Sequence, residues 1–209
     1  DTQLGFAVRA HCGPILGLPR HTDTDAYWRC RSEIPEPELA RLFLSAAGVS
    51  DWLIDTGFAS GVADLEGVAA LTVGEVREVV RLESIAERAA AAPGDYALAF
   101  DNILWQRTRD AAATKSILAY RGGFIGDLSD PSPAEVVDAA TGWRDRGGTH
   151  LTDRVLLRFG LHRALRLGKP LQFHVGFGDR DCDLSATNPV HLLDFLRVSG
   201  DTPVILLHC

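Results

Sequence analysis

Residues 171–209 read LQFHVGFGDRDCDLSATNPVHLLDFLRVSGDTPVILLHC and contain the clearest β–α–β pattern of the chain. Short apolar runs at residues 171–175 and 204–209 predict two strands, and Asn188-Pro189 opens a helix with a leucine stripe between them. His174 and His208 lie near the ends of these runs, 208 − 174 = 34 residues apart, which suits one βαβ unit. The pattern therefore predicts two parallel strands joined by a right-handed crossover.

The same alternation of strands and helices extends toward the N-terminus and predicts an α/β fold. Strands are predicted at residues 6–12, 52–56, 78–83 and 114–120, and a proline-containing capping box at residues 132–135 predicts the start of a helix. Repeated βα units fit either an open doubly wound sheet or a closed barrel. An open nucleotide-binding sheet usually has a glycine-rich phosphate loop after its first strand, and residues 13–17 (GPILG) do not match one. The pattern therefore favours the barrel.

The composition argues against several classes of partner. The chain has 209 residues, 46% of them hydrophobic, which allows one sizeable core. The net charge is -7 without a run of Lys or Arg, so a nucleic-acid partner is not expected, and no apolar run is long enough to span a membrane. The four cysteines show no CxxC spacing, which favours a reducing, cytoplasmic setting. We expect a small-molecule substrate and no membrane partner, and a homo-oligomer is compatible with these features.

Three histidines stand near the ends of predicted strands: His11, His174 and His208. In a βα barrel the carboxyl ends of the strands form the active site, and side chains from different strands can meet there. Neutral imidazole is a common ligand of zinc and similar metals. Any one histidine taken alone is more often structural or solvent-facing than a ligand, and that alternative stays open. The pattern predicts that these three histidines bind one divalent metal.

Four further polar residues are candidates for the same site. Glu83, Lys115 and Arg121 are predicted at strand ends and are assigned to substrate binding, and Asp179, in the loop after His174, is assigned to catalysis together with His208. The forked guanidinium of Arg121 suits a substrate carboxylate, and an ordinary salt bridge is an equal alternative. Lys115 either bridges metals as a carbamylated lysine or pairs with a carboxylate, and the second reading is slightly favoured. Asp179 either orients substrate or water, or caps a turn.

Several stretches of the chain together resemble a known family. Residues 115–121 (KSILAYR), 171–179 (LQFHVGFGD) and 204–209 (VILLHC) resemble the fourth-, fifth- and sixth-strand motifs of amidohydrolase family 2. Residues 53–58 (LIDTGF) and 81–83 (RLE) are similar to its second and third strands. Within the amidohydrolase superfamily of metal-dependent hydrolases, the chain resembles the amidohydrolase-related domain found fused to glutamine-synthetase-like domains. The resemblance covers nearly the whole chain and is stronger in its second half.

The resemblance implies a (β/α)8 TIM barrel. Residues 1–209 are then one amidohydrolase-type domain with about six βα units, truncated at the C-terminus and incomplete at the N-terminus. It also implies a divalent metal, usually zinc, and metal-assisted hydrolysis of a small polar substrate, with decarboxylation known among relatives. The family's ligand positions on strands one, five and six correspond to His11, His174 and His208. Gly13 stands where a second strand-one histidine is expected, so a metal-free barrel that serves as a binding or regulatory domain is the alternative.

Overall fold

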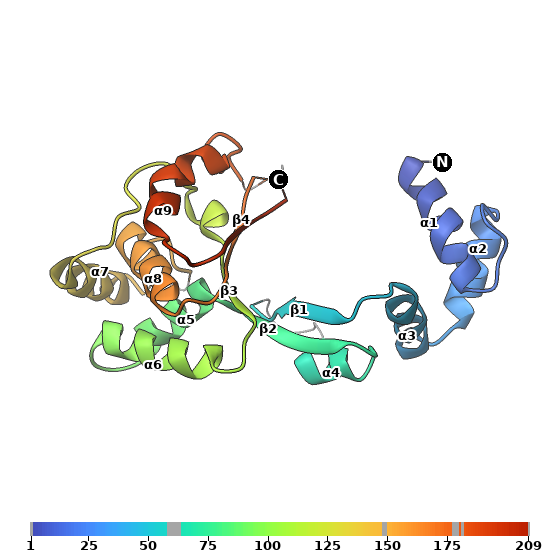
Figure 1. Ribbon diagram of the computed structural model, residues 1–209, viewed down its shortest axis with the longest axis horizontal. Coiled ribbons are helices and arrows are strands. Elements are labelled where there is room, and N and C mark those ends of the chain that lie inside the picture. Colours follow the sequence, from blue (N-terminus) through green and yellow to red (C-terminus); the bar gives the residue numbers. More distant parts are fainter. Residues whose placement is uncertain (1, 58–63, 148–149, 177–179, 181, 209) are drawn as a thin grey trace. The chain divides into compact units, whose positions relative to one another are not determined.

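The computed structural model describes residues 2–57, 64–147, 150–176, 180 and 182–208. These residues belong to two compact units. Unit 1 comprises Asp1–Trp52 and Gly61–Val76, and unit 2 comprises Leu53–Ser60 and Arg77–Cys209. Each unit is described by itself below, and Figure 1 labels the helices and strands. None of the helices in the described ranges is long and apolar enough to cross a membrane.

Unit 1 consists mainly of helices, and its first helix replaces a predicted strand. Its helices are α1 (Gln3–Ile15), α2 (Thr24–Glu33), α3 (Glu36–Ala46) and α4 (Leu65–Ala69). The Thr2 side chain caps α1 by accepting a hydrogen bond from the Gly5 N–H at 3.0 Å. The buried residues of α1 are Arg9, Ala10 and Gly13, whose spacing of three and four is that of one helix face. The strand predicted at residues 6–12 was therefore wrong, because a short apolar run is equally compatible with a helix.

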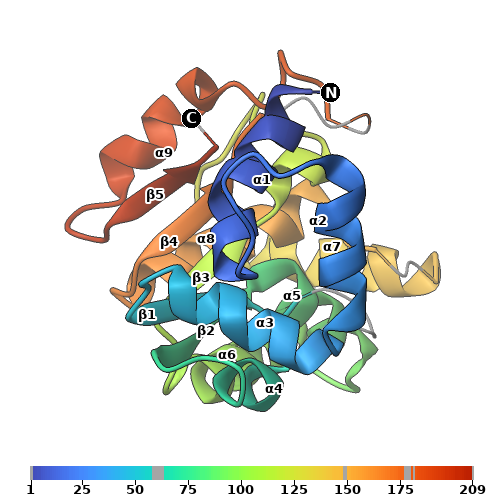
Figure 2. The same cartoon turned by 90° about the vertical axis from the view of Figure 1, so that its right-hand side faces the viewer.

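The sheet has five strands in the described residues: β1 (Asp51–Asp55), β2 (Glu75–Arg81), β3 (Ala113–Ser116), β4 (Leu171–His174) and β5 (Val204–Leu207). Their order is β1-β2-β3-β4-β5, and the pairs β2–β3, β3–β4 and β4–β5 are parallel. Figure 2 shows β4 and β5 side by side. This linear order leaves β1 and β5 at the two edges, so the prediction of a (β/α)8 TIM barrel with about six βα units was wrong. One unit was lost because residues 6–12 form part of α1.

Helices α5 to α9 lie on one side of strands β3 to β5 in unit 2 (Figure 1). They are α5 (Leu82–Ala91), α6 (Tyr96–Thr108), α7 (Pro133–Asp145), α8 (Arg154–Arg166) and α9 (Leu193–Val198). Short 3-10 helices η1 (Leu118–Arg121) and η2 (Pro189–Leu192) follow β3 and precede α9. The predicted capping box is confirmed, since Ser132 and Glu135 exchange hydrogen bonds at the start of α7.

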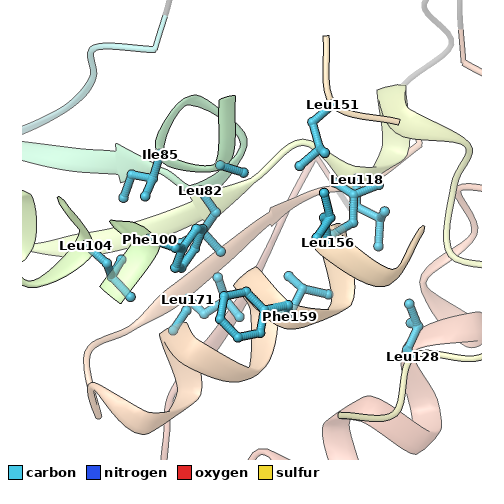
Figure 3. Packing of buried hydrophobic residues seen from close by; sticks show 14 of the residues in the cluster. Leu82, Ile85, Phe100, Leu104, Leu118, Leu128, Leu151, Leu156, Phe159 and Leu171 are labelled. Carbon is cyan, nitrogen blue, oxygen red and sulfur yellow. The ribbon is translucent and has the colours of Figure 1, made fainter. Parts of the chain in front are cut away.

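The core of unit 2 lies between the sheet and this helical layer. Phe100 of α6 meets Phe159 of α8 edge to face, with ring centroids 5.2 Å apart, and Leu171 of β4 belongs to the same buried cluster (Figure 3). A methyl group at Gly160 would lie 3.3 Å from Cζ of Phe100, so the absence of a side chain there lets α8 approach α6 closely. Each of these buried rings contributes about 1.5–3 kcal/mol of hydrophobic stabilisation. This packing fixes the strands whose carboxyl ends carry the candidate site.

Candidate functional site

Two histidines meet at the carboxyl ends of neighbouring parallel strands. His174 is the last residue of β4, and His208 directly follows β5, where His174 is in register with Leu207. Their ring centroids are 4.6 Å apart. His174 is 9% exposed, whereas His208 is an exposed residue with a φ of 68°. A left-handed conformation is rare in a residue other than glycine and is found at sites where the surrounding structure enforces it.

Tyr120, which follows β3, contacts the first of these two histidines. It lies in η1, directly after β3, and its hydroxyl oxygen is 2.8 Å from Nε2 of His174. The two ring centroids are 4.5 Å apart. The hydroxyl donates to Nε2 in one imidazole tautomer and accepts from it in the other. No role was predicted for Tyr120 from the sequence, although its place at the end of the predicted strand, next to Arg121, is a signal that could have identified it.

A second polar cluster surrounds Asp55, the last residue of β1. Its Oδ2 lies 2.7 Å from Nη2 of Arg81 and 2.9 Å from Nζ of Lys115, and its Oδ1 accepts the Gly57 N–H at 2.9 Å. Burial by itself would raise the pKa of Asp55, but the hydrogen bonds from Arg81, Gly57 and Lys115 outweigh it and hold the pKa below its usual value. Lys115 is thus a lysine paired with a carboxylate, which was the slightly favoured alternative.

Arg81 and Lys115 lie on the same face of the sheet because they are paired in register across β2 and β3. Lys115 is in turn paired with Gln172 of β4, so the polar row continues one strand further. The opposite side of β4 carries Leu171 and Phe173, which are fully buried. The sheet therefore has an apolar face toward the helices and a polar face that bears charge near the carboxyl ends of its strands.

Glu83 is fully buried directly after β2, in the first turn of α5 rather than at a strand end. Its Oε1 accepts hydrogen bonds from Oγ of Ser116 at 2.7 Å and from the Ile117 N–H at 3.0 Å. Within the described parts of the chain, Oε2 has no hydrogen-bond partner. Burial raises the pKa of Glu83, although these hydrogen bonds and the charge of Arg81 oppose the rise.

A cavity of about 450 Å³ lies in unit 2, lined by residues that follow β1, by the end of β2, and by residues of α5, α6 and η1 together with His150. Its walls carry three guanidinium groups and two carboxyl groups, together with one imidazole; these belong to Arg81, Arg107, Arg121, Glu83, Glu87 and His150. Arg121 ends η1, and its Nη2 lies 3.6 Å from Oε1 of Glu87. Of the predicted substrate-binding residues, the cavity thus brings Glu83 and Arg121 together, whereas Lys115 lies with Asp55.

The remaining predicted site residues are placed differently. His11 is an exposed residue in the middle of α1 in unit 1, so its prediction as a strand-end residue was wrong. Asp179 lies outside the described residues. Where the structure describes side chains, it shows no group of three or more His, Cys, Asp or Glu residues that could hold a metal. His174 and His208 can supply two of the four ligands that zinc usually takes.

The chain was compared with known proteins, and a structural likeness to one solved structure was found. No protein-family model matches the chain, and no curated protein matches it either. The chain is similar to a protein of Lactobacillus casei ATCC 334, solved at 1.40 Å resolution and described as a "putative metal-dependent hydrolase". The two are 27% identical, with a TM-score of 0.75. The match covers 99% of this chain and 56% of the Lactobacillus casei chain, so this chain spans little more than half of that protein.

Proposed function

We propose that this chain is part of a metal-dependent hydrolase that acts on a small polar substrate, with His174 and His208 as metal ligands. The observation that carries the proposal is the 4.6 Å separation of these two imidazole rings at the carboxyl ends of adjacent parallel strands. Two ligands of one zinc ion have their nitrogens roughly 3–4 Å apart, a spacing that rings this close can reach. The likeness to the Lactobacillus casei protein supports the same class of activity.

The chemistry at this site would divide between the metal and the residues of the chain. A bound divalent metal lowers the pKa of water and polarises a carbonyl group. The Tyr120 hydroxyl fixes the orientation of the His174 ring through its contact with Nε2. We propose that His208, exposed at the strand end, also stabilises charge that develops on the substrate. Arg81 and Lys115 are both paired with the carboxylate of Asp55.

The finer points of the function rest on the family resemblance and on ligand chemistry. We propose an amidohydrolase-type reaction, with decarboxylation as the other reaction of such sites, and zinc as the metal because imidazole nitrogen suits it. Asp179 remains a proposed catalytic residue, and Glu83, Lys115 and Arg121 remain proposed contacts of the substrate. A cytoplasmic location and a homo-oligomeric assembly are also still predictions.

The second candidate function is a metal-free protein that binds a small molecule or regulates a partner. Two observations favour it: the described residues offer only two clustered imidazoles, and Nε2 of His174 already has Tyr120 as its neighbour at 2.8 Å. Gly13, which the resemblance places at a ligand position, lies within a helix and carries no ligating side chain.

Metal binding by the purified full-length protein separates these two candidates. Zinc content after purification and the Kd for added zinc would be measured for the wild type and for His174→Ala, His208→Ala and His11→Ala. His191→Ala is the matched control, because His191 is an exposed imidazole that contacts the Ser185 carbonyl oxygen instead. We expect His174→Ala and His208→Ala each to weaken zinc binding by more than about tenfold. Equal zinc affinity in all four variants and the wild type would overturn the proposed ligands.

A further inference from the structure

Arg121 is poorly paired for a guanidinium that is mostly buried. Its side chain is 20% exposed, and none of the described residues accepts a hydrogen bond from its buried Nε. The distance of 3.6 Å from its Nη2 to Oε1 of Glu87 is too long for a hydrogen bond, although the opposite charges still attract. A guanidinium has five N–H donors in a rigid plane, and leaving a buried one without an acceptor costs about 1–3 kcal/mol or more.

Glu87 is itself held by other groups, which explains why it does not satisfy Arg121. Its Oε1 accepts the Leu151 N–H at 2.9 Å, and the same oxygen lies 3.8 Å from Nδ1 of His150. The carboxylate is therefore anchored to the segment that precedes α8. Its charge opposes that of Arg121 across 3.6 Å, a distance too long for a hydrogen bond.

The other guanidinium groups in the wall of the cavity have carboxylates of their own. Arg81 binds Asp55 through Nη2 and the Gly57 carbonyl oxygen through Nη1. Arg107 is bound to Glu78, and its side chain is 38% exposed. Glu83, the second carboxyl group in the wall, accepts hydrogen bonds from Ser116 and from the Ile117 N–H instead. Among the described residues, Arg121 is therefore the guanidinium of the wall that has no hydrogen-bonded carboxylate.

From this geometry we infer that the cavity is an anion subsite, in which the guanidinium of Arg121 binds a carboxylate or phosphate group in a bidentate manner. Both anions present two oxygens at the spacing of the guanidinium fork, and both are smaller than the cavity volume of about 450 Å³. Arg107 and His150 line the same cavity, so they can contact the oxygens of the anion that Arg121 does not bind. The identification of this anion as part of the substrate rests on the proposed function, whereas the binding of the anion does not.

Anion binding can be tested without metal and without turnover. The full-length protein, stripped of metal and dialysed free of chelator, would be titrated with succinate or inorganic phosphate at constant ionic strength. Neutral succinamide serves as the control ligand. The ¹H–¹⁵N signal of the Arg121 Nε–H, assigned by its loss in Arg121→Lys, reports binding at the residue, and calorimetry gives the Kd.

We expect the Arg121 Nε–H signal to shift with at least one of the two anions and not with succinamide. Arg121→Gln should weaken that anion at least about tenfold, and Arg121→Lys, which keeps the charge and loses the fork, should weaken it less. Arg197→Gln, which removes an exposed guanidinium paired with Asp194, should leave the Kd unchanged. Preference for succinate over phosphate identifies a carboxylate subsite, and the reverse identifies a phosphate subsite.

The inference is overturned if succinamide binds as tightly as succinate, if neither anion shifts the Nε–H signal, or if Arg197→Gln weakens binding as much as Arg121→Gln. If Arg121→Gln fails to unfold cooperatively, Arg121→Lys carries the comparison, because it keeps a positive charge opposite Glu87. A protein that binds the anion and no zinc would retain the subsite and refute the metal-dependent hydrolase. A protein that binds zinc at His174 and His208 and no anion would retain the metal-dependent hydrolase and refute the anion subsite.

Discussion

Replacement of Glu83 by glutamine should change the pH dependence of stability in a direction that follows from burial. The carboxyl group is fully buried, and burial raises its pKa above its usual value of 4.5. Between that value and the folded-state pKa, the unfolded chain has lost the proton while the folded chain keeps it. The free energy of unfolding then falls as pH rises, at about 1.4 kcal/mol per pH unit. This loss begins near pH 4.5 and ends once the folded-state pKa is passed.

Glutamine has the shape of the protonated carboxyl group and does not ionise. Its amide oxygen can accept the same two hydrogen bonds, from Oγ of Ser116 and from the Ile117 N–H. At pH 4.5 we therefore expect Glu83→Gln and the wild type to differ by less than about 1 kcal/mol. Above that pH the variant should gain on the wild type by up to about 1.4 kcal/mol per pH unit.

Urea unfolding at several pH values between 4.5 and 7.5 would measure this difference, followed by tryptophan fluorescence and by far-UV circular dichroism to establish that the two transitions coincide. Glu83→Ala is the companion variant. It leaves the Ser116 hydroxyl and the Ile117 N–H without their acceptor, at about 1–3 kcal/mol each, and should be destabilised at every pH. Parallel stability curves for the wild type and Glu83→Gln would refute the reasoning, because they would mean that Glu83 titrates in the folded protein as it does in the unfolded chain.

Three further predictions concern the packing, a helix end and the edge of the sheet. Phe100→Ala should lower the free energy of unfolding by about 3–5 kcal/mol, whereas Trp105→Ala on the same helix, 66% exposed, should cost far less in the same urea experiment. Arg144→Lys should cost about 1–3 kcal/mol in thermal unfolding, because the guanidinium donates to the carbonyl oxygens of Ala90, Ala92 and Gly94 at the end of α5, which one ammonium group cannot all reach. The chain 1–209 should associate through β5, because β5 is an edge strand on which Ile205 is 39% exposed. Ile205→Lys should therefore reduce the mass measured by light scattering. A monodisperse monomer of the unsubstituted chain would contradict this prediction.

Local chemistry made much of the helical layer and the order of the strands predictable from sequence. The capping box at Ser132 and Glu135 carries its own start signal, so α7 begins where the sequence predicts. Five of the predicted apolar runs are strands because each is short, bounded by turn residues and repeated in βα order. The closeness of His174 and His208 follows from the same order, since parallel neighbours bring residues at their carboxyl ends to one edge.

Features that depend on contacts distant in sequence were decided only by the tertiary structure. Residues 6–12 form a helix because Thr2 caps it and one helical face is buried, and an apolar run of that length has no preference of its own. Lys115 and Asp55 are sixty residues apart in the sequence, and Tyr120 and His174 are 54 apart. No local sequence pattern therefore predicts that either pair is in contact. The raised pKa of Glu83, and the Nε of Arg121 for which the described residues offer no acceptor, likewise come from burial. Burial is a property of the packed chain, because water is excluded from these groups only once helices and sheet have closed around them.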